Sequence, residues 1–577
     1  MKTMKNSLII LLIAAFAIIG GCKEEYAIPT LTAPATQNVE VGKSVDLSFS
    51  YTVEGKFSQS AIVATGGTAA IKTDGAAGST SGTIVVTFTA GSTVGAGSVM
   101  LSVTDEEAQL ASSTAVLSVF EKGAPSVSTP ASSTTILVNA VDITFPFTSE
   151  AGYKSAAITA TNGTASIKTG AADGATTGNV VVTFMGGSES GAGTTVLTIT
   201  DNNNKTGSAT AAVDIKKGIS VSANISANTT WETGKIYILE TRIAVLSGVT
   251  LTIQPGAIIK GQAGTGSNAT ALIVARGAKL DAQGTDVSPI IFTSISDNIL
   301  PGEIVSPNLS PDLDGLWGGL LLLGNAPISA SASPKQIEGI PASDQNGLYG
   351  GTDAADNSGT VKFVSIRHGG ANIGEGNEIN GLTLGGVGSG TLIENVEIVA
   401  NQDDGIEWFG GTVNVRNAIV WNAGDDAIDT DQAWGGTLDN FIVITPFDKC
   451  FELDGPEGSA AAKHIIKNGN VKAGNAVSLV DIDNANDSKD SYLDFMNIYF
   501  YNVRKPQVFD ALPKFATYPF TFSDFQVTLP VSTTIQDFFK DGSDAFATVV
   551  ELNANTKGAD KTKFAGTWSW AAKAAAY

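Results

Sequence analysis

The sequence predicts an all-β protein in which two tandem β-sandwiches precede a parallel-stranded solenoid. Three observations support this prediction: a glycine-rich and weakly charged composition, a duplication one small domain long, and a shorter repeat through the rest of the chain. The 577 residues include 64 glycines, and only 16% are charged, which is typical of an all-β protein with many turns. A hydrophobic share of 43% is enough to build cores and argues against disorder.

The duplication lies in the N-terminal part of the chain. Segment 66–73 matches segment 162–169, so the two copies are 96 residues apart. Each copy alternates apolar and polar residues, which is the pattern of strands with one buried face. We therefore predict two immunoglobulin-like β-sandwiches without disulfides, over 23–121 and 122–218.

The second repeat occupies residues 219–577. An asparagine recurs about every 22 residues, at Asn395, Asn417 and Asn440. Such a period with several short strands is typical of a solenoid, whose turns stack about 4.8 Å apart. The asparagines are then expected to form a ladder of hydrogen-bonded amides. The expected inward apolar column consists of Leu382, Ile406, Ile428, Phe451 and Val477.

These repeats resemble the right-handed parallel β-helix proteins of the pectin-lyase-like superfamily, over about 219–577. The resemblance implies a right-handed parallel β-helix. The repeat fades from about residue 511, where a C-terminal cap is expected. Solenoids need such caps, and Phe564, Trp568 and Trp570 are expected to seal the open end of the core.

The first 22 residues are expected to be an export signal. Lys2 and Lys5 precede an apolar run over 8–19 that is too short to span a membrane comfortably. Cys22 ends a segment that resembles a bacterial lipobox, in which the cysteine is lipidated. The next three residues are similar to the signal by which Bacteroidota export surface lipoproteins. We therefore expect a lipid bilayer as partner through the N-terminal anchor, and an outer-membrane location facing the cell exterior.

Charge and composition exclude several functions. The 56 acidic and 34 basic residues give a net charge of −22, which repels phosphate backbones, so no nucleic acid is expected as partner. If Cys22 is lipidated, Cys450 is the last cysteine and no intramolecular disulfide can form. The two histidines, His368 and His464, are far apart in sequence, which argues against a zinc site or a Ser-His-Asp triad.

A carboxylate cluster is the candidate functional site. Glu407, Asp429 and Glu452 each follow the inward column by one residue, so they should point outward, one above the next. Asp431 and Asp454 face the same side, and with Asp429 and Glu452 they would form a square with edges of roughly 5 to 7 Å. A register slip of one residue would instead bury the column. Beside it lie two acidic turns, formed by Asp403, Asp404, Asp425 and Asp426.

Three interpretations of this cluster remain open. All nine carboxylates are candidate ligands for Ca²⁺, which favours oxygen ligands and needs no histidine. Alternatively, two acids act as general acid and base on a glycosidic bond, with Asp429, Glu452, Asp431 and Asp454 as catalytic candidates. The third interpretation is a solvated acidic face with raised pKa values and no ligand.

The resemblance bears on this choice. Segments 401–405 and 423–427 are similar to the Asp-Asp motif of polygalacturonase-type hydrolases, but the accompanying Gly-His-Gly and Arg-Ile-Lys motifs are missing. Lyases of the superfamily pair calcium with an arginine or lysine base on the same face. Arg416 is nearest in sequence, but it belongs to the strand of the asparagine ladder, which is expected on a different face, and Lys449, at the edge of the acidic strand, is a weaker candidate. A shared fold does not by itself show that a protein has an enzymatic activity. We therefore expect a non-enzymatic surface protein that binds polysaccharide or another surface ligand, or mediates adhesion, with calcium stiffening the helix. Trp408 and Trp434 are candidates for stacking on sugar rings. The alternative is a polysaccharide lyase or glycoside hydrolase.

Overall fold

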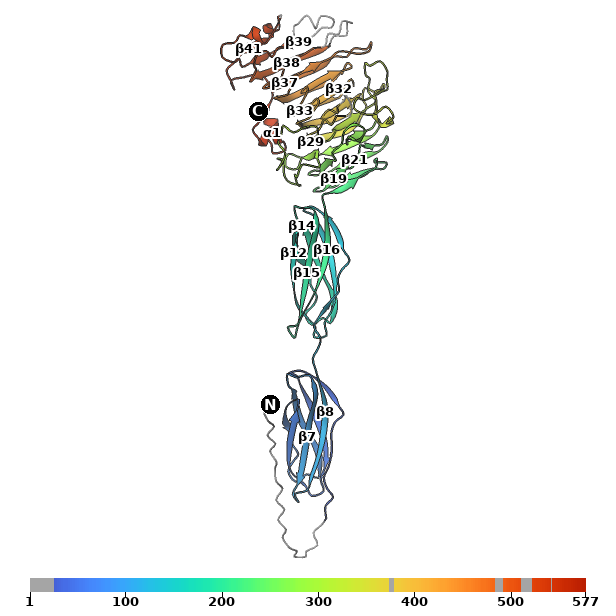
Figure 1. Cartoon of the computed structure of the whole chain (residues 1–577), viewed down its shortest axis with the longest axis vertical. Helices are drawn as coiled ribbons and strands as arrows, with labels where there is room; N and C mark the ends of the chain where they lie inside the picture. Colours follow the sequence, from blue (N-terminus) through green and yellow to red (C-terminus); the bar gives the residue numbers. More distant parts are fainter. Residues whose placement is uncertain (1–24, 373–377, 483–490, 510–520, 541) are drawn as a thin grey trace, which may run out of the picture.

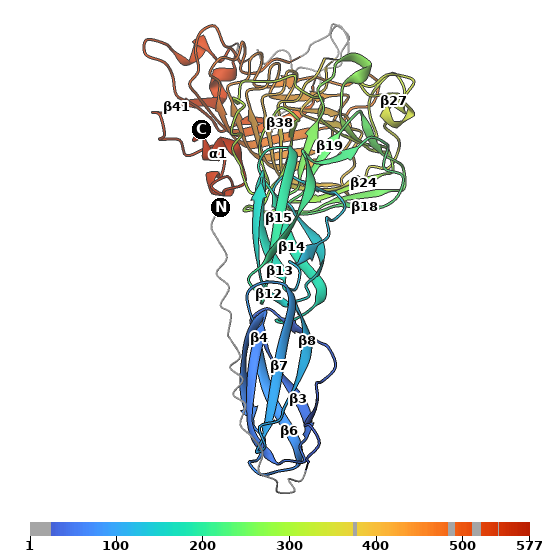
Figure 2. The same ribbon diagram turned by 60° about the horizontal axis from the view of Figure 1, so that its bottom comes forward.

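The computed structural model describes residues 25–372, 378–482, 491–509, 521–540 and 542–577. Two slender sandwiches lie in line below a wide solenoid (Figures 1 and 2). The predicted fold class, two immunoglobulin-like sandwiches followed by a parallel β-helix, is confirmed. The predicted lipidation site, Cys22, lies outside the described residues. Within the described part of the chain, no helix has the length and hydropathy of a membrane span.

The first sandwich packs two four-stranded sheets face to face, in the orders β1-β3-β6-β5 and β2-β8-β7-β4. Alternate residues such as Leu47 and Phe49 are fully buried between the sheets, as the period-two pattern predicts. The strands are β1 (Thr30–Thr32), β2 (Gln37–Glu40), β3 (Ser44–Thr52), β4 (Phe57–Thr65), β5 (Gly67–Thr73), β6 (Ser81–Ala90), β7 (Gly95–Asp105) and β8 (Leu110–Phe120).

The second sandwich repeats this arrangement, with sheets β9-β11-β14-β13 and β10-β16-β15-β12. Even a surface ion pair is duplicated, because Lys72 contacts Asp46 in the first copy and Lys168 contacts Asp142 in the second. The strands are β9 (Ser126–Val127), β10 (Ser133–Ile136), β11 (Ala140–Thr148), β12 (Tyr153–Thr161), β13 (Gly163–Thr169), β14 (Thr177–Gly186), β15 (Gly191–Asp201) and β16 (Thr206–Lys216).

The two joints between the domains differ in chemistry. Between the sandwiches the contacts are polar: Asn203 donates a hydrogen bond of 2.7 Å to Glu40, and Lys205 lies 2.9 Å from Glu121. Between the second sandwich and the solenoid an apolar contact is added to polar ones, such as the hydrogen bond of 2.5 Å that Lys235 donates to Asn139. Four isoleucines of the first solenoid turns join the core of the second sandwich: Ile236, Ile258, Ile291 and Ile299.

The solenoid coils through a sixteen-stranded sheet, here the long sheet, and a seven-stranded sheet. The long sheet contains β17 (Ile219–Val221), β18 (Thr229–Trp231), β19 (Ile236–Leu239), β21 (Thr250–Ile253), β22 (Ile258–Gly261), β24 (Lys279–Gln283), β25 (Ile290–Ser294), β29 (Gly359–Arg367), β31 (Leu392–Val399), β33 (Asn414–Trp421), β35 (Thr437–Ile444), β37 (His464–Lys472), β38 (Leu493–Tyr501), β39 (Thr521–Ser523), β40 (Phe525–Val527) and β41 (Ala547–Val549). The seven-stranded sheet contains β20 (Ile243–Val245), β23 (Leu272–Val274), β26 (Leu320–Leu323), β30 (Leu382–Gly385), β32 (Ile406–Phe409), β34 (Ile428–Asp431) and β36 (Glu452–Leu453).

The predicted inward column holds for its first four members, which are fully buried: Leu382, Ile406, Ile428 and Phe451. The fifth is wrong, because Val477 is 61% exposed. Glu452 pairs with Asp481, which brings the buried Val480 into the column instead. The turn of chain between β35 and β37 is longer than the two turns immediately before it, so a fixed period misplaces the register there.

The predicted asparagine ladder is confirmed. Asn417 donates to Asn395 over 2.8 Å, and Asn440 donates to Asn417 over 2.7 Å. All three residues have φ between 54° and 63°, the left-handed region that asparagine tolerates better than most residues. The ladder thus fixes a sharp turn in successive coils of the solenoid.

The predicted role of the C-terminal aromatics is wrong. Phe564, Trp568 and Trp570 pack on the outer face of the long sheet, against residues such as Ile419 and Ile442. The short helix α1 (Trp570–Lys573) is held there by buried Glu397, which accepts hydrogen bonds from the amides of Trp570 and Ala571. The end of the core is filled instead by phenylalanines: Phe509, Phe522, Phe525, Phe538 and Phe539.

Candidate functional site: an acidic cavity on the solenoid

Glu407, Asp429 and Glu452 lie on the outer face of the seven-stranded sheet, as predicted, but the first two are buried. Glu407 pairs with Asp429, and Asp429 pairs with Glu452, as the repeat predicts. Glu407 and Asp429 nevertheless retain only 7% and 9% exposure. Register does not cause this burial, because Ile406 and Ile428 still point into the core.

A loop covers this face. Residues 324–358, here the covering loop, connect β26 to β29 and carry β27 (Lys335–Gln336), a 3-10 turn (Gln345–Gly347) and β28 (Leu348–Tyr349). The Tyr349 hydroxyl donates to Gln432 over 2.9 Å, and its ring lies 5.9 Å from that of Phe409. Loop and sheet therefore form one packed unit around the carboxylates.

A cavity of about 410 Å³ remains between the covering loop and the sheet, here the acidic cavity. Its lining residues are Lys335, Gln336, Glu338, Tyr349, Glu407, Phe409, Asp429, Asp431, Gln432, Asp454 and Glu457. Four of the predicted site residues thus come together: Glu407, Asp429, Asp431 and Asp454. Lys335 is the only basic residue in this lining, and it lies 2.8 Å from Glu457.

The inner carboxyls have strongly perturbed protonation. Burial, followed by the charge of Glu407, raises the pKa of Asp429 well above its usual range. Burial and the charge of Asp404 do the same to the pKa of Glu407, whose carboxylate accepts a hydrogen bond from Asn380. Among the described residues, Oδ1 of Asp429 has no hydrogen-bond partner. A buried carboxyl group in this state needs a proton or a cation.

Two outer carboxyls of the acidic cavity, Asp431 and Glu457, have pKa values shifted in opposite directions. Burial and the charge of Glu457 raise the pKa of Asp431 to about 7. Burial would also raise the pKa of Glu457, but hydrogen bonds from Lys335 and Gln432 outweigh it and lower that pKa. Asp431 is therefore the easier of the two to protonate near neutral pH.

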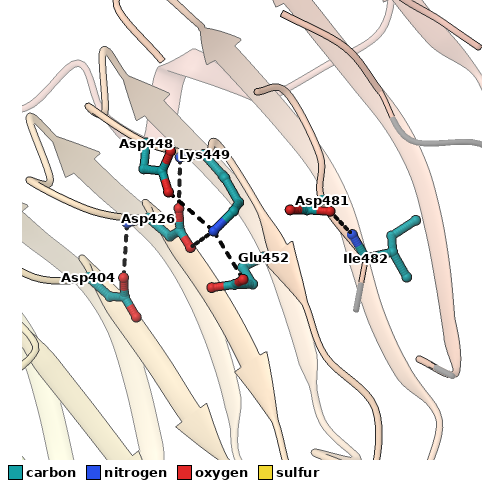
Figure 3. A network of polar contacts seen from close by, with 7 residues as sticks. All are labelled: Asp404, Asp426, Asp448, Lys449, Glu452, Asp481 and Ile482. Carbon is teal, nitrogen blue, oxygen red and sulfur yellow. Dashed lines mark hydrogen bonds and ion pairs between the residues drawn. The ribbon is translucent and has the colours of Figure 1, made fainter. Parts of the chain in front are cut away.

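Glu452 does not share the environment of Asp429. Its carboxylate lies 3.0 Å from the Lys449 ammonium group, which also lies 3.2 Å from Asp426 and 3.3 Å from Asp448 (Figure 3). We call these four residues the Lys449 network. Burial would lower the pKa of Lys449, but Asp426 and Glu452 raise it above its usual range. A raised pKa opposes the role of Lys449 as a lyase base, because a base must be neutral.

The acidic turns complete the arrangement. Asp404 accepts a hydrogen bond of 2.9 Å from the amide of Asp426, one turn of the solenoid further on. Three triads each bring one oxygen per residue within 4.8 Å of the others: Asp403–Asp404–Asp425, Asp404–Glu407–Asp429 and Asp425–Asp426–Asp448. Oxygen ligands of this kind suit Ca²⁺. The third triad already has the Lys449 ammonium group beside it.

The predicted stacking role of Trp408 and Trp434 is wrong. Both rings are in the solenoid core, with 0% and 1% exposure, and they stack on each other at 4.5 Å between centroids. Trp408 follows Ile406 by two residues on β32, so strand alternation points it inward. The period that placed Glu407 outward already predicted this.

Several residues of the site were not predicted from the sequence. Glu338, Tyr349 and Glu457 lie in loops, where the repeat gives no position. Asp481 continues the Glu407–Asp429–Glu452 column but was lost with the register near Val477. The signal available for Asp481 was that a shift of three residues aligns it with Glu452.

Comparisons with known proteins bear mainly on the solenoid. Residues 223–493 match the family model described as a pectate-lyase like beta helix domain. No curated protein matches the chain significantly.

Solved structures with low similarity include tandem titin domains. Titin Z1Z2 in complex with telethonin is 16% identical, with 33% of this chain and 96% of that chain covered and a TM-score of 0.22. Titin-A168169 is 17% identical, with 33% of this chain and 99% of that chain covered and a TM-score of 0.15. The sialic acid binding region of a Streptococcus sanguinis SK1 adhesin is 8% identical, with 33% of this chain and 78% of that chain covered and a TM-score of 0.15. Scores of this size carry no functional argument. The family match and the long parallel sheet together support placing the solenoid in the pectin-lyase-like superfamily.

Proposed function

We propose that this chain is a lipid-anchored cell-surface protein that binds carbohydrate in the acidic cavity of its β-helix. The β-helix domain supports a carbohydrate-related role. The observation that carries the proposal is the acidic cavity itself: about 410 Å³, roofed by the covering loop and lined by polar groups. Specific ligand pockets usually have about this volume, roughly 300–1,000 Å³, and a few converging polar groups.

The anchor and the stalk supply the setting. Lipidation of Cys22 would attach the chain to the outer membrane, and the two sandwiches in line would hold the solenoid away from the lipid (Figure 2). The test is incorporation of a labelled fatty acid in cells, with Cys22→Ala as the variant that should lose it. Digestion of the solenoid by external protease in intact cells would place it on the exterior. Label retained in Cys22→Ala would contradict the anchor.

Calcium is proposed as the ion that neutralises the inner carboxylates. Asp404, Glu407 and Asp429 offer three oxygens within 4.8 Å of one another, and Asp429 has an oxygen without a partner among the described residues. Bound calcium would stabilise the solenoid by an amount that grows with the logarithm of the calcium concentration above the dissociation constant. Isothermal titration of the metal-free protein with calcium tests this, and no heat of binding would contradict it.

A polysaccharide lyase or hydrolase is the second candidate. The pKa of Asp431, about 7, would let this carboxyl donate a proton at neutral pH, as a general acid must. The missing hydrolase motifs and the raised pKa of Lys449 count against it.

One experiment separates these functions. The whole chain carrying Cys22→Ser would be tested for binding and for product release on a panel of neutral, acidic and amine-bearing polysaccharides. Binding without new reducing ends or unsaturated uronides, weakened in Asp431→Asn, would support the binding protein. Products that vanish in Asp429→Asn and Asp431→Asn would make it an enzyme. Neither binding nor products from any polymer would contradict both.

A further inference from the structure

We infer that the acidic cavity selects a glycan bearing free primary amines, and that one ammonium group of this glycan docks against Asp429. The inference rests on the proposed function and names its ligand class. The superfamily resemblance suggests acidic polysaccharides, which are negatively charged, whereas the ligand inferred here is positively charged.

The charge of the lining is one-sided. Six carboxyl groups line the acidic cavity: Glu338, Glu407, Asp429, Asp431, Asp454 and Glu457. Against them stands one lining cation, Lys335, which is already paired with Glu457 at 2.8 Å. An ammonium group entering this space would stabilise the ionised form of Glu407, Asp429 and Asp431 and displace the protons that their raised pKa values retain, whereas a uronate would raise those pKa values further.

Asp429 supplies the contact point. Its side chain is more than nine-tenths buried and lines the cavity, and within the described residues its Oδ1 has no partner. An unpaired buried oxygen of this kind destabilises the fold, so a hydrogen-bond donor that reaches it is favoured. A neutral sugar hydroxyl would supply a hydrogen bond but no charge, leaving the repulsion from Glu407 uncompensated.

The solenoid contains an internal precedent for the proposed contact. One turn further along the same sheet, the Lys449 ammonium group lies 3.0–3.3 Å from the carboxylates of Glu452, Asp426 and Asp448. Glu452 is the register partner of Asp429. The stacked carboxylates of this fold therefore accommodate a primary ammonium group, and among the described residues Glu407 and Asp429 form no ion pair with a lysine.

The volume favours a glycan amine over a bare ion as the occupant. A cavity of about 410 Å³ exceeds what one cation fills, and Gln432 and Tyr349 lie beside the acids. Calcium and the amine would compete for the same carboxylates, so calcium should weaken amine binding.

The test uses the whole chain carrying Cys22→Ser and two matched probes at pH 6: a β-1,4-linked glucosamine hexamer and its fully N-acetylated counterpart. The two probes share ring and linkage and differ in the charge of the nitrogen. Titration calorimetry should give at least tenfold tighter binding to the glucosamine hexamer. Asp429→Asn, and separately Asp431→Asn in case the first does not fold, should remove most of that preference. Asp281→Asn, on the long sheet, is the charge-matched control and should keep it.

The outcomes are distinct. Equal affinity for both hexamers would overturn the inference while leaving carbohydrate binding intact. If the preference for the amine survives in all three variants, its cause is the overall charge of −22 and not Asp429, which would also overturn the inference. Calcium binding without competition against the glucosamine hexamer would place the amine elsewhere. Failure to bind any glycan would instead contradict the proposed function.

Discussion

Replacing Lys449 with methionine tests the electrostatic account of the acidic face most directly. The substitution keeps the length of the side chain and removes the ammonium group that lies 3.2 Å from Asp426 and 3.0 Å from Glu452. Asp426 has a side-chain exposure of 1%, so its carboxylate would be left buried without its cation. Removing one partner of a buried ion pair costs about 3–5 kcal/mol.

The loss should depend on pH. Burial, followed by the hydrogen bond with Glu452, raises the folded-state pKa of Asp426 to about 10 even beside Lys449, which acts to lower it, so removing Lys449 would raise this pKa further above its value in the unfolded chain. A group shifted in this direction is tolerated when protonated, and stability falls as pH rises above the unfolded pKa near 4. The variant should therefore be close to the parent at pH 4, and its loss of stability relative to the parent should grow as pH rises toward the pKa of Asp426. In a domain of this size the loss corresponds to a fall in melting temperature of roughly 5–10 °C.

Thermal unfolding at several pH values, followed by circular dichroism, is the assay. Lys467→Met is the matched control, because Lys467 pairs with Asp439 at 3.6 Å near the surface and its loss should cost less than about 1 kcal/mol. The double variant Lys449→Met with Asp426→Asn should recover much of the stability, since no buried charge remains. A loss that is independent of pH, or that persists in the double variant, would refute the reasoning.

Three further predictions follow from the same geometry. Asp429→Asn should raise the melting temperature of the metal-free protein at pH 8 but not at pH 4, because burial and Glu407 raise the pKa of Asp429 and the amide removes that penalty; an equal effect at both pH values would contradict the assigned repulsion. Trp408→Ala should destabilise the solenoid by about 3–5 kcal/mol in denaturant unfolding, as expected for a large buried side chain, whereas a ligand-facing tryptophan would cost little. Tyr349→Phe should remove the hydrogen bond to Gln432, cost about 1 kcal/mol, and speed hydrogen exchange in the covering loop but not in β34; unchanged exchange in the loop would show that this contact does not hold it.

The parts of this fold that repeat were predictable, and the parts that do not repeat were not. Strand alternation and the asparagine spacing predicted that Ile406 points inward, that Glu407 points outward and that Asn417 bonds Asn395. These depend only on neighbouring turns of chain. The prediction for Val477 failed where one turn changes length, because a fixed period carries no information about an insertion.

The burial of the side chains in the candidate site depends on segments that are distant from them in sequence. The alternation of β32 predicts the direction of Glu407, but its burial comes from the covering loop, whose position the repeat does not encode. Likewise, Trp570 is aromatic and close to the C-terminus, which suggested an end cap. Its place beside Glu397 is set by a hydrogen bond between residues far apart in the chain.

The difference between the two joints has a mechanical consequence. The four isoleucines, Ile236 among them, fasten the second sandwich to the solenoid through a shared apolar core, whereas Asn203 and Glu40 join the sandwiches through solvated polar contacts. Apolar joints resist bending more than small polar ones. We therefore expect the second sandwich and the solenoid to move together as one body about the joint between the sandwiches, which would carry the acidic cavity through a wider arc than bending at the base of the solenoid would.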